Sequence, residues 1–261
     1  MISKADESLR FNTIEESIEA FSKETSLFPP FPSKHHEPRK FTCPQRRNGE
    51  FIVVLDSKNR ENEGDLVIAA DSVTAAKMAF MIRYSSGYIC APIPPSLCTN
   101  LNLPQMVSEN ADPNGTAYTI SIDATDPTVT TGISAYDRAL TCRTLARPDV
   151  QPTDFRRPGH ILPLRARPGG VLERPGHTEA AIDFCRLSGK PEAAVICELV
   201  EDGVEVEGVP ALEGNGMMRG RRCLEFGKRW GLKVCTIEDL KEYLRREEGK
   251  GKGKPMVNGN H

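Results

Sequence analysis

The sequence predicts a single α/β domain of the α+β type, in which helices flank a mixed β-sheet. Short apolar runs typical of buried strands intermix with segments of helical periodicity, without a strict strand–helix repeat. A chain of 261 residues can bury one sizeable core, whereas a second full domain would be cramped. We therefore expect one folded domain over residues 48–246, between an N-terminal segment (1–47) and a tail (247–261).

The N-terminal segment combines a helix with a proline-rich stretch. Ile14, Ile18 and Phe21 recur at i, i+4 and i+7, which predicts a short amphipathic helix over residues 11–22. Residues 24–47 are rich in proline, which opposes helix and central strand, so we expect an exposed, partly disordered loop. This stretch is either a genuine surface insertion or an artefact of the gene model, such as retained intron sequence.

The remaining elements follow from apolar runs, helical periodicity and the positions of proline and glycine. Thr178 is predicted to cap the helix that follows it, and Pro158 to lie in a loop before a strand. The low-complexity tail is expected to be disordered. Strands are predicted over residues 51–56, 66–70, 88–93, 117–123, 160–164, 194–200 and 232–236, and helices over residues 73–84, 135–146, 179–189, 219–230 and 237–246.

The overall composition narrows the class of protein. A net charge of -2 argues against nucleic-acid binding, and no apolar run approaches the roughly 20 residues that span a bilayer. The first residues resemble neither a secretory signal nor a transit peptide. The cysteines are irregularly spaced and form no CxxC pair, so we expect buried reduced thiols and a cytoplasmic protein.

The stretch Arg60–Leu66 is unusually polar for its position between two strand-like runs. Glu61, Glu63 and Asp65 supply three carboxylates, and Gly64 is expected to allow a sharp bend. Magnesium prefers such oxygen ligands, but a solvated acidic turn explains the stretch equally well.

A second cluster, Arg174-Pro175-Gly176-His177-Thr178, opens a helical run. Free N–H groups at a helix start bind anions, and an adjacent arginine favours phosphate. An ordinary capped helix with a surface histidine is the alternative.

Two further residues stand out from their surroundings. Glu198 lies in an apolar strand, where a buried carboxylate is costly unless it is paired or bound. It is either an edge residue facing water or an acid or base poised by partial burial. His160 begins another apolar strand and is, taken alone, more typical of a core histidine than of a catalytic one.

Organic cofactor motifs are missing, because the sequence contains neither a Walker A loop nor GxGxxG. Carboxylates, two histidines and an anion pocket together indicate proton-transfer chemistry on a phosphorylated substrate with a divalent ion.

Taken together, the motifs resemble those of the 3,4-dihydroxy-2-butanone 4-phosphate synthase family of riboflavin biosynthesis. The resemblance runs from about residue 48 to residue 246. It is carried by DSKNRENEGDLVIAA, YICAPI, YTISIDA, TTGISAYDRALTCR, RPGHILPLRARPGGVLERPGHTEAAIDF and AVICELVEDG.

This resemblance implies the family fold and a lyase that converts D-ribulose 5-phosphate to formate and L-3,4-dihydroxy-2-butanone 4-phosphate. It further implies a magnesium cofactor, with manganese as an alternative, and a homodimer whose active sites lie at the subunit interface. Two departures are the segment 24–47 and the basic run Arg219-Gly220-Arg221-Arg222, where relatives often carry an acidic residue.

Residue roles are carried over position by position. Glu61 and His177 match the metal ligands, and His160 and Glu198 match the essential catalytic residues, with His160 supplied by the partner subunit in one reading. The positions that match substrate contacts are Arg60, Glu61, Asp65, Arg174, Pro175, Gly176, His177, Thr178 and Glu198.

Two rival functions remain open from the sequence. One is another metal-dependent sugar-phosphate lyase or isomerase that uses enediol chemistry. The other is a small-molecule-binding module that kept the fold without turnover.

Overall fold

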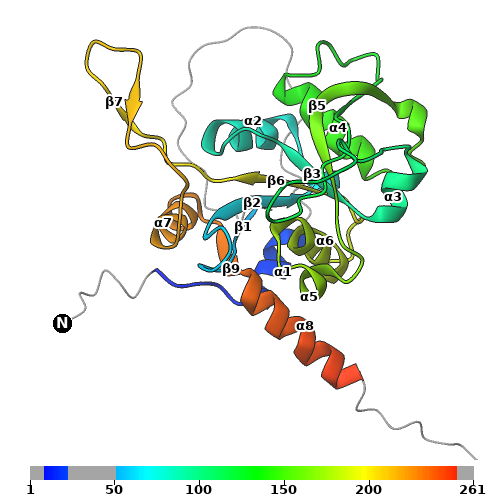
Figure 1. Cartoon of the computed structure of the whole chain (residues 1–261). Helices are drawn as coiled ribbons and strands as arrows, with labels where there is room; N and C mark the ends of the chain where they lie inside the picture. Colours follow the sequence, from blue (N-terminus) through cyan, green and yellow to red (C-terminus); the bar gives the residue numbers. More distant parts are fainter. Residues whose placement is uncertain (1–8, 23–50, 252–261) are drawn as a thin grey trace, which may run out of the picture.

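The structure, a computed structural model, describes residues 9–22 and 51–251. Within these residues seven strands form one sheet in the order β4–β5–β3–β6–β2–β1–β9 (Figure 1). Parallel pairs (β1 with β9, β3 with β5) accompany antiparallel pairs, which confirms the predicted α/β fold with a mixed sheet. The strands are β1 (Ile52–Leu55), β2 (Gly64–Ala69), β3 (Cys90–Ile93), β4 (Ile122–Ala124), β5 (Phe155–Arg165), β6 (Ala194–Glu198) and β9 (Lys233–Thr236).

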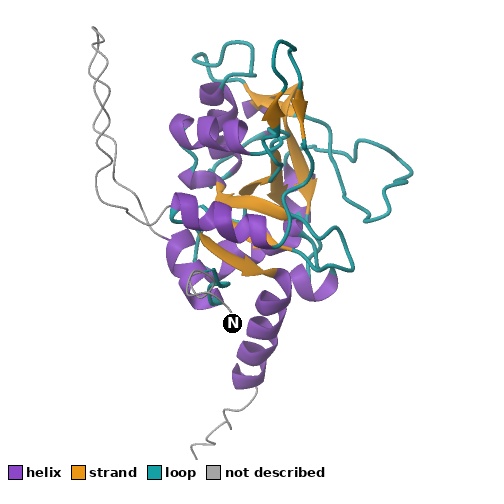
Figure 2. Cartoon of the chain, turned by 90° about the vertical axis from the view of Figure 1, so that its left-hand side faces the viewer, coloured by secondary structure: helices purple, strands orange, loops and turns teal. Residues whose placement is uncertain are grey.

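Helices pack around this central sheet and create two apolar cores (Figure 2). One core contains side chains of α2, α4 and α7, and the other contains side chains of α1, α6 and α8. Because both faces are covered, the strands read as continuous apolar runs rather than as alternating patterns. The helices are α1 (Ile14–Ser22), α2 (Ala75–Tyr84), α3 (Pro95–Asn100), α4 (Ala135–Leu145), α5 (Gly170–Glu173), α6 (His177–Leu187), α7 (Arg221–Trp230) and α8 (Ile237–Gly251).

The N-terminal helix belongs to the folded body. Asn12 exchanges two hydrogen bonds with Val234 of β9, from its backbone N–H to the carbonyl (2.6 Å) and from the Val234 N–H to its side chain (2.9 Å). The ring of Phe21 packs 5.8 Å from that of Phe184 on α6. The predicted amphipathic helix is thus confirmed, whereas the proline-rich residues 24–47 lie outside the described residues.

Three local predictions are wrong. The N-cap of α6 is Gly176 rather than Thr178, because Gly176 has the extended backbone and Thr178 lies inside the first turn. Pro158 lies within β5, which is possible because β5 pairs with β3 only over residues 162–165 and its pairing with β4 shifts register between Arg156 and Ile161. Helix α8 continues to Gly251, so residues 247–251 are not part of a disordered tail.

The sequence patterns also missed a hairpin. Strands β7 (Val204–Glu205) and β8 (Leu212–Glu213) pair outside the main sheet and project away from it (Figure 1). Their apolar residues are exposed, so no buried face produces a periodic signal.

No helix among residues 9–22 and 51–251 combines the length and apolar character needed to cross a membrane.

Candidate functional site

Most of the predicted site residues converge on one cavity of about 160 Å³. The cavity lies where the acidic loop between β1 and β2, the end of β6, the start of α6 and the loop before β4 come together. Its lining contains five carboxylates and only two guanidinium groups, an excess of negative charge that favours a bound cation. The polar and charged lining residues are Arg60, Glu61, Glu63, Asp65, Asp112, Thr116, Tyr118, Arg174, His177, Thr178 and Glu198, with Cys90 beside them.

Asp56, which the sequence reasoning did not assign to the site, fixes the conformation of the acidic loop. Its carboxylate accepts hydrogen bonds from the backbone N–H groups of Glu61 (3.0 Å) and Glu63 (2.9 Å) and from the Arg60 guanidinium (2.8 Å). Its own N–H donates to the Glu63 carbonyl. An aspartate at the end of an apolar strand that caps backbone N–H groups is a typical turn former, which is the signal that could have identified it.

The predicted role of Gly64 as a bend is wrong. Gly64 is the first residue of β2, and the residue with a positive φ in the loop is Asn62 (φ 55). A Cβ at position 64 would lie 2.7 Å from the Sγ of Cys223, so glycine is required for close packing against α7.

Asp65 and Glu198 face each other across the antiparallel β2–β6 pair. Asp65 is 2 % exposed, and its Oδ1 atom is buried without a hydrogen-bond partner among the described residues. Burial, followed by repulsion from Glu198 and Glu61, raises the pKa of Asp65 well above its ordinary value. A buried orphan oxygen among like charges is stabilised by a proton or by a bound cation.

His177 is prepared for metal coordination. Its Nε2 lies 3.1 Å from the Val54 carbonyl, which can only accept, so Nε2 carries the proton and Nδ1 is left with a free lone pair. That Nδ1 lies 3.6 Å from Asp65 Oδ1 and 3.9 Å from Glu61 Oε2. Burial lowers the pKa of His177 to about 4, which keeps the imidazole neutral at pH 7.

The side chains therefore fit a divalent cation held by Glu61 and His177. A neutral imidazole held by a backbone carbonyl and a carboxylate is a suitable donor set. Asp56, Glu61 and His177 bring ligand atoms within 4.8 Å of one another. The Asp56 oxygens accept from two backbone N–H groups of the loop, whereas the Glu61 oxygens accept, among the described residues, only from the Arg60 and Asn114 side chains, which can give way to an ion. The unsatisfied Asp65 oxygen beside them supports the same conclusion.

Arg174 is anchored more firmly than a free phosphate-binding arginine. Its guanidinium donates to Glu179 (2.6 Å), to the Asn114 carbonyl (3.0 Å) and to the Thr116 hydroxyl (3.3 Å). Asn114 in turn donates from its side chain to Glu61 Oε1 at 2.7 Å. The loop around residues 110–117, which the sequence reasoning left unassigned, thus connects the two predicted clusters.

Three of the predicted site residues, His160, Pro175 and Gly176, do not line this cavity, whereas the others do. The Nδ1 of His160 lies 2.9 Å from Asp123 Oδ2, and the same carboxylate accepts from the His160 N–H (2.9 Å) and from Arg156 (3.3 Å). A Cβ at Gly132 would lie 2.0 Å from Asp123 Oδ2, so the loop before α4 closes tightly over this pair. Because Asp123 fixes Nδ1, the Nε2 atom of the half-exposed imidazole is the one available for proton transfer.

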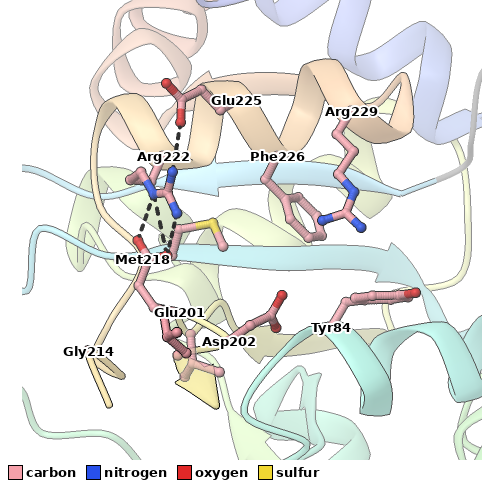
Figure 3. A pocket seen from close by; sticks show the side chains of 12 residues that line it. Tyr84, Glu201, Asp202, Gly214, Met218, Arg222, Glu225, Phe226 and Arg229 are labelled. Carbon is pink, nitrogen blue, oxygen red and sulfur yellow. Dashed lines mark hydrogen bonds and ion pairs between the residues drawn. The ribbon is translucent and has the colours of Figure 1, made fainter. Parts of the chain in front are cut away.

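A larger hollow of about 400 Å³ between α7 and the β7–β8 arm is chemically less suited to catalysis (Figure 3). Of its two arginines, Arg222 already pairs with Glu201 (3.0 Å) and with Glu225 (3.1 Å), and Arg229 lies over the Trp230 ring. In the smaller cavity, Asp65 and Glu198 pair with no lysine or arginine of residues 9–22 and 51–251, so this cavity is the better candidate site despite its size.

The fold and the cavity define an α/β protein with an acidic site that suits a divalent cation. Comparison with known proteins makes this class specific. The family profile described as 3,4-dihydroxy-2-butanone 4-phosphate synthase matches residues 42–243. The chain belongs to the 3,4-dihydroxy-2-butanone 4-phosphate synthase family.

Two individual relatives and one solved structure carry the name of the same family. The chain is 62% identical over 204 residues to a 3,4-dihydroxy-2-butanone 4-phosphate synthase of Pyricularia oryzae, covering 78% of this chain and 88% of the relative. It is 53% identical to that of Schizosaccharomyces pombe, covering 76% and 93%. A crystal structure of such a synthase in complex with two magnesium ions superposes with a TM-score of 0.81 at 55% identity, covering 92% of this chain and all of that one.

The lowered pKa of His177 predicts how the free energy of unfolding of the metal-free protein depends on pH. Between pH 6.5 and about 4 the unfolded chain binds a proton at this histidine that the folded chain does not, so acidification lowers the free energy of unfolding. In a His177→Gln variant this contribution, up to about 3 kcal/mol, should disappear. Urea unfolding at several pH values in EDTA measures it, and an equal acid-induced loss in both proteins would contradict the assignment.

Proposed function

We propose that the protein converts D-ribulose 5-phosphate to formate and L-3,4-dihydroxy-2-butanone 4-phosphate, a step of riboflavin biosynthesis. Family membership supports this reaction, and one observation of the site carries it. Asp65, Glu198, Glu61 and His177 surround a single cavity in which a buried carboxylate oxygen has no partner among the described residues. That environment suits a cation and a sugar with vicinal oxygens.

Proton transfer is assigned to Glu198 and His160. The reaction begins with loss of a proton from C3 of a ketose phosphate, and later steps need further acids and bases. Glu198 is the carboxylate at the end of β6 that reaches the cavity, and His160 presents Nε2 because Asp123 holds Nδ1. A bound magnesium or manganese ion at Glu61 and His177 would supply stabilisation of negative charge on substrate oxygens.

Substrate binding is assigned to residues of the acidic loop and of the α6 start. Arg60 and Asp65 line the cavity on one side, and Arg174 and Thr178 on the other. The first N–H groups of α6 have no acceptor within the helix, so the run Arg174-Pro175-Gly176-His177-Thr178 suits the phosphate group. Arg174 serves by orienting this segment as well as by its charge, because each of its three guanidinium nitrogens already donates one hydrogen bond.

We further propose a homodimer in which His160 of one subunit completes the cavity of the other. One chain presents Glu198 in the cavity but His160 outside it. Large apolar side chains are exposed near both residues. Tyr88, two residues before the Cys90–Ile196 pair that joins β3 to the Glu198 strand, is 49 % exposed. Ile133, which follows the Gly132 that lies against His160, is 52 % exposed. Exposed apolar patches of this kind favour association.

The buried free thiols favour a reducing, cytoplasmic location.

Formate release tests the reaction. The protein should release formate from D-ribulose 5-phosphate with magnesium and none with EDTA. Glu198→Ala and Glu61→Ala should each lower the rate by at least about 10²-fold with the fold intact, because each removes a positioned group. Glu192→Ala is a matched control, since that exposed carboxylate lies outside the cavity and its ion pair within the described part of the chain is with Arg186.

The other outcomes separate the rival functions. Conversion of the sugar phosphate without formate would identify a different lyase or an isomerase. Binding without turnover would identify a non-enzymatic module. Wild-type turnover in Glu198→Ala would disprove its catalytic assignment.

Mixing two inactive variants tests the shared site. If His160 and Glu198 act across subunits, a mixed dimer of His160→Ala and Glu198→Ala chains contains one intact site. Random exchange of equal amounts should then restore about a quarter of the wild-type activity. If mass spectrometry of differently tagged chains shows mixed dimers and the mixture stays inactive, both residues come from one subunit. If it shows no dimer at all, the proposed homodimer is wrong.

A further inference from the structure

Ser86, in the turn between α2 and β3, contacts Glu198 through two separate hydrogen bonds. Its backbone N–H donates to the Glu198 carbonyl at 2.8 Å, and its hydroxyl donates to Glu198 Oε2 at 2.8 Å. Ser86 does not line the cavity, whereas Glu198 does. Ser86 therefore contacts the proposed catalytic carboxylate from outside the cavity.

The direction of the hydroxyl bond follows from its other partner. The Ser86 Oγ accepts a hydrogen bond from the Tyr88 N–H at 3.2 Å, and a hydroxyl has only one proton to donate. Cys197 Sγ also lies 3.2 Å from this oxygen and can donate to it. The single hydroxyl proton is thus directed at Glu198 Oε2, while Oε1 has no donor within residues 9–22 and 51–251.

The turn that carries Ser86 is itself held in place. Gly87 has a positive φ of 72, and its carbonyl accepts a hydrogen bond at 3.1 Å from Arg138, a buried arginine of α4. The N–H of Gly87 donates to the hydroxyl of Ser85, which bonds back to α2. Because the turn already fixes this hydroxyl, little conformational entropy is lost when it forms the hydrogen bond to Glu198.

Glu198 needs such a contact because of its neighbour. Asp65 lies directly opposite on β2, and the like charges repel each other. A glutamate side chain also loses considerable rotamer freedom when it is held in one orientation. A charge-assisted hydrogen bond from Ser86 offsets both effects.

We infer that Ser86 is a positioning residue for Glu198: its hydroxyl fixes Oε2 so that Oε1 is presented to the substrate. This inference rests on the proposed function of Glu198. It assigns no contact between Ser86 and the substrate, so the residue acts on the rate of the chemical step and not on binding.

Three variants of the full chain test the inference with magnesium and D-ribulose 5-phosphate. Ser86→Ala should lower kcat by about 10- to 100-fold, the effect of losing a hydrogen bond to a charged group, and change KM by less than about twofold. Ser86→Thr retains a hydroxyl and should recover most of the loss. Ser188→Ala removes a comparable serine hydroxyl at the far end of α6 and should leave kcat unchanged. All three should keep the wild-type Tm.

A crystal structure of Ser86→Ala provides a readout that is independent of the reaction, in which the Glu198 carboxylate should move or become disordered. A Glu198 that keeps its position, or a wild-type kcat in Ser86→Ala, would overturn the inference. Ser86→Thr as slow as Ser86→Ala at an unchanged Tm would also overturn it. Absence of formate release by the wild-type protein would instead disprove the proposed function, and the crystal structure would still decide the role of Ser86.

Discussion

The concentration of negative charge around one small cavity is the constraint on which the site depends. Asp65 and Glu198 are forced together by the register of β2 and β6, and the acidic loop adds Glu61 and Glu63. Burial and then repulsion raise the pKa values of Asp65 and Glu63, so the ionised carboxylates are electrostatically unfavourable without a cation beside them. A divalent cation relieves this cost, which links the fold of the loop to the proposed chemistry.

Rigid supports hold the reactive groups from outside the cavity. Asp56 fixes the acidic loop, the Val54 carbonyl fixes the tautomer of His177, and Asp123 fixes His160. Helix α4 supports the surroundings of both Glu198 and His160. Its Arg138 holds the turn that carries Ser86, and its Asp137 accepts hydrogen bonds from Thr130 and Gly132 in the loop beside His160. The proposed reactive side chains are therefore oriented by hydrogen bonds from residues that lie outside the cavity.

The sequence predicted the fold class, because buried strands leave a local signal. The resemblance to the family assigned Glu61, Asp65, His177 and Glu198 to one site, whereas the local pattern alone left their roles open. The sequence did not predict the supports. The capping role of Asp56 depends on a loop conformation, and the contact between Ser86 and Glu198 joins segments far apart in the chain. The error at Gly64 has the same origin, since its restriction comes from Cys223 on a distant helix. His160 lies outside the cavity of one chain, and the proposed homodimer is the arrangement that would bring it to a cavity.

Anomalous diffraction from crystals of the protein grown with Mn²⁺ tests the central claim most directly. Manganese favours carboxylate ligands and gives a strong anomalous signal at the position of the ion. We expect a peak bonded to the Glu61 carboxylate and to Nδ1 of His177, with Nε2 still on the Val54 carbonyl. A peak on Asp56 in place of Glu61, or coordination through Nε2, would contradict it.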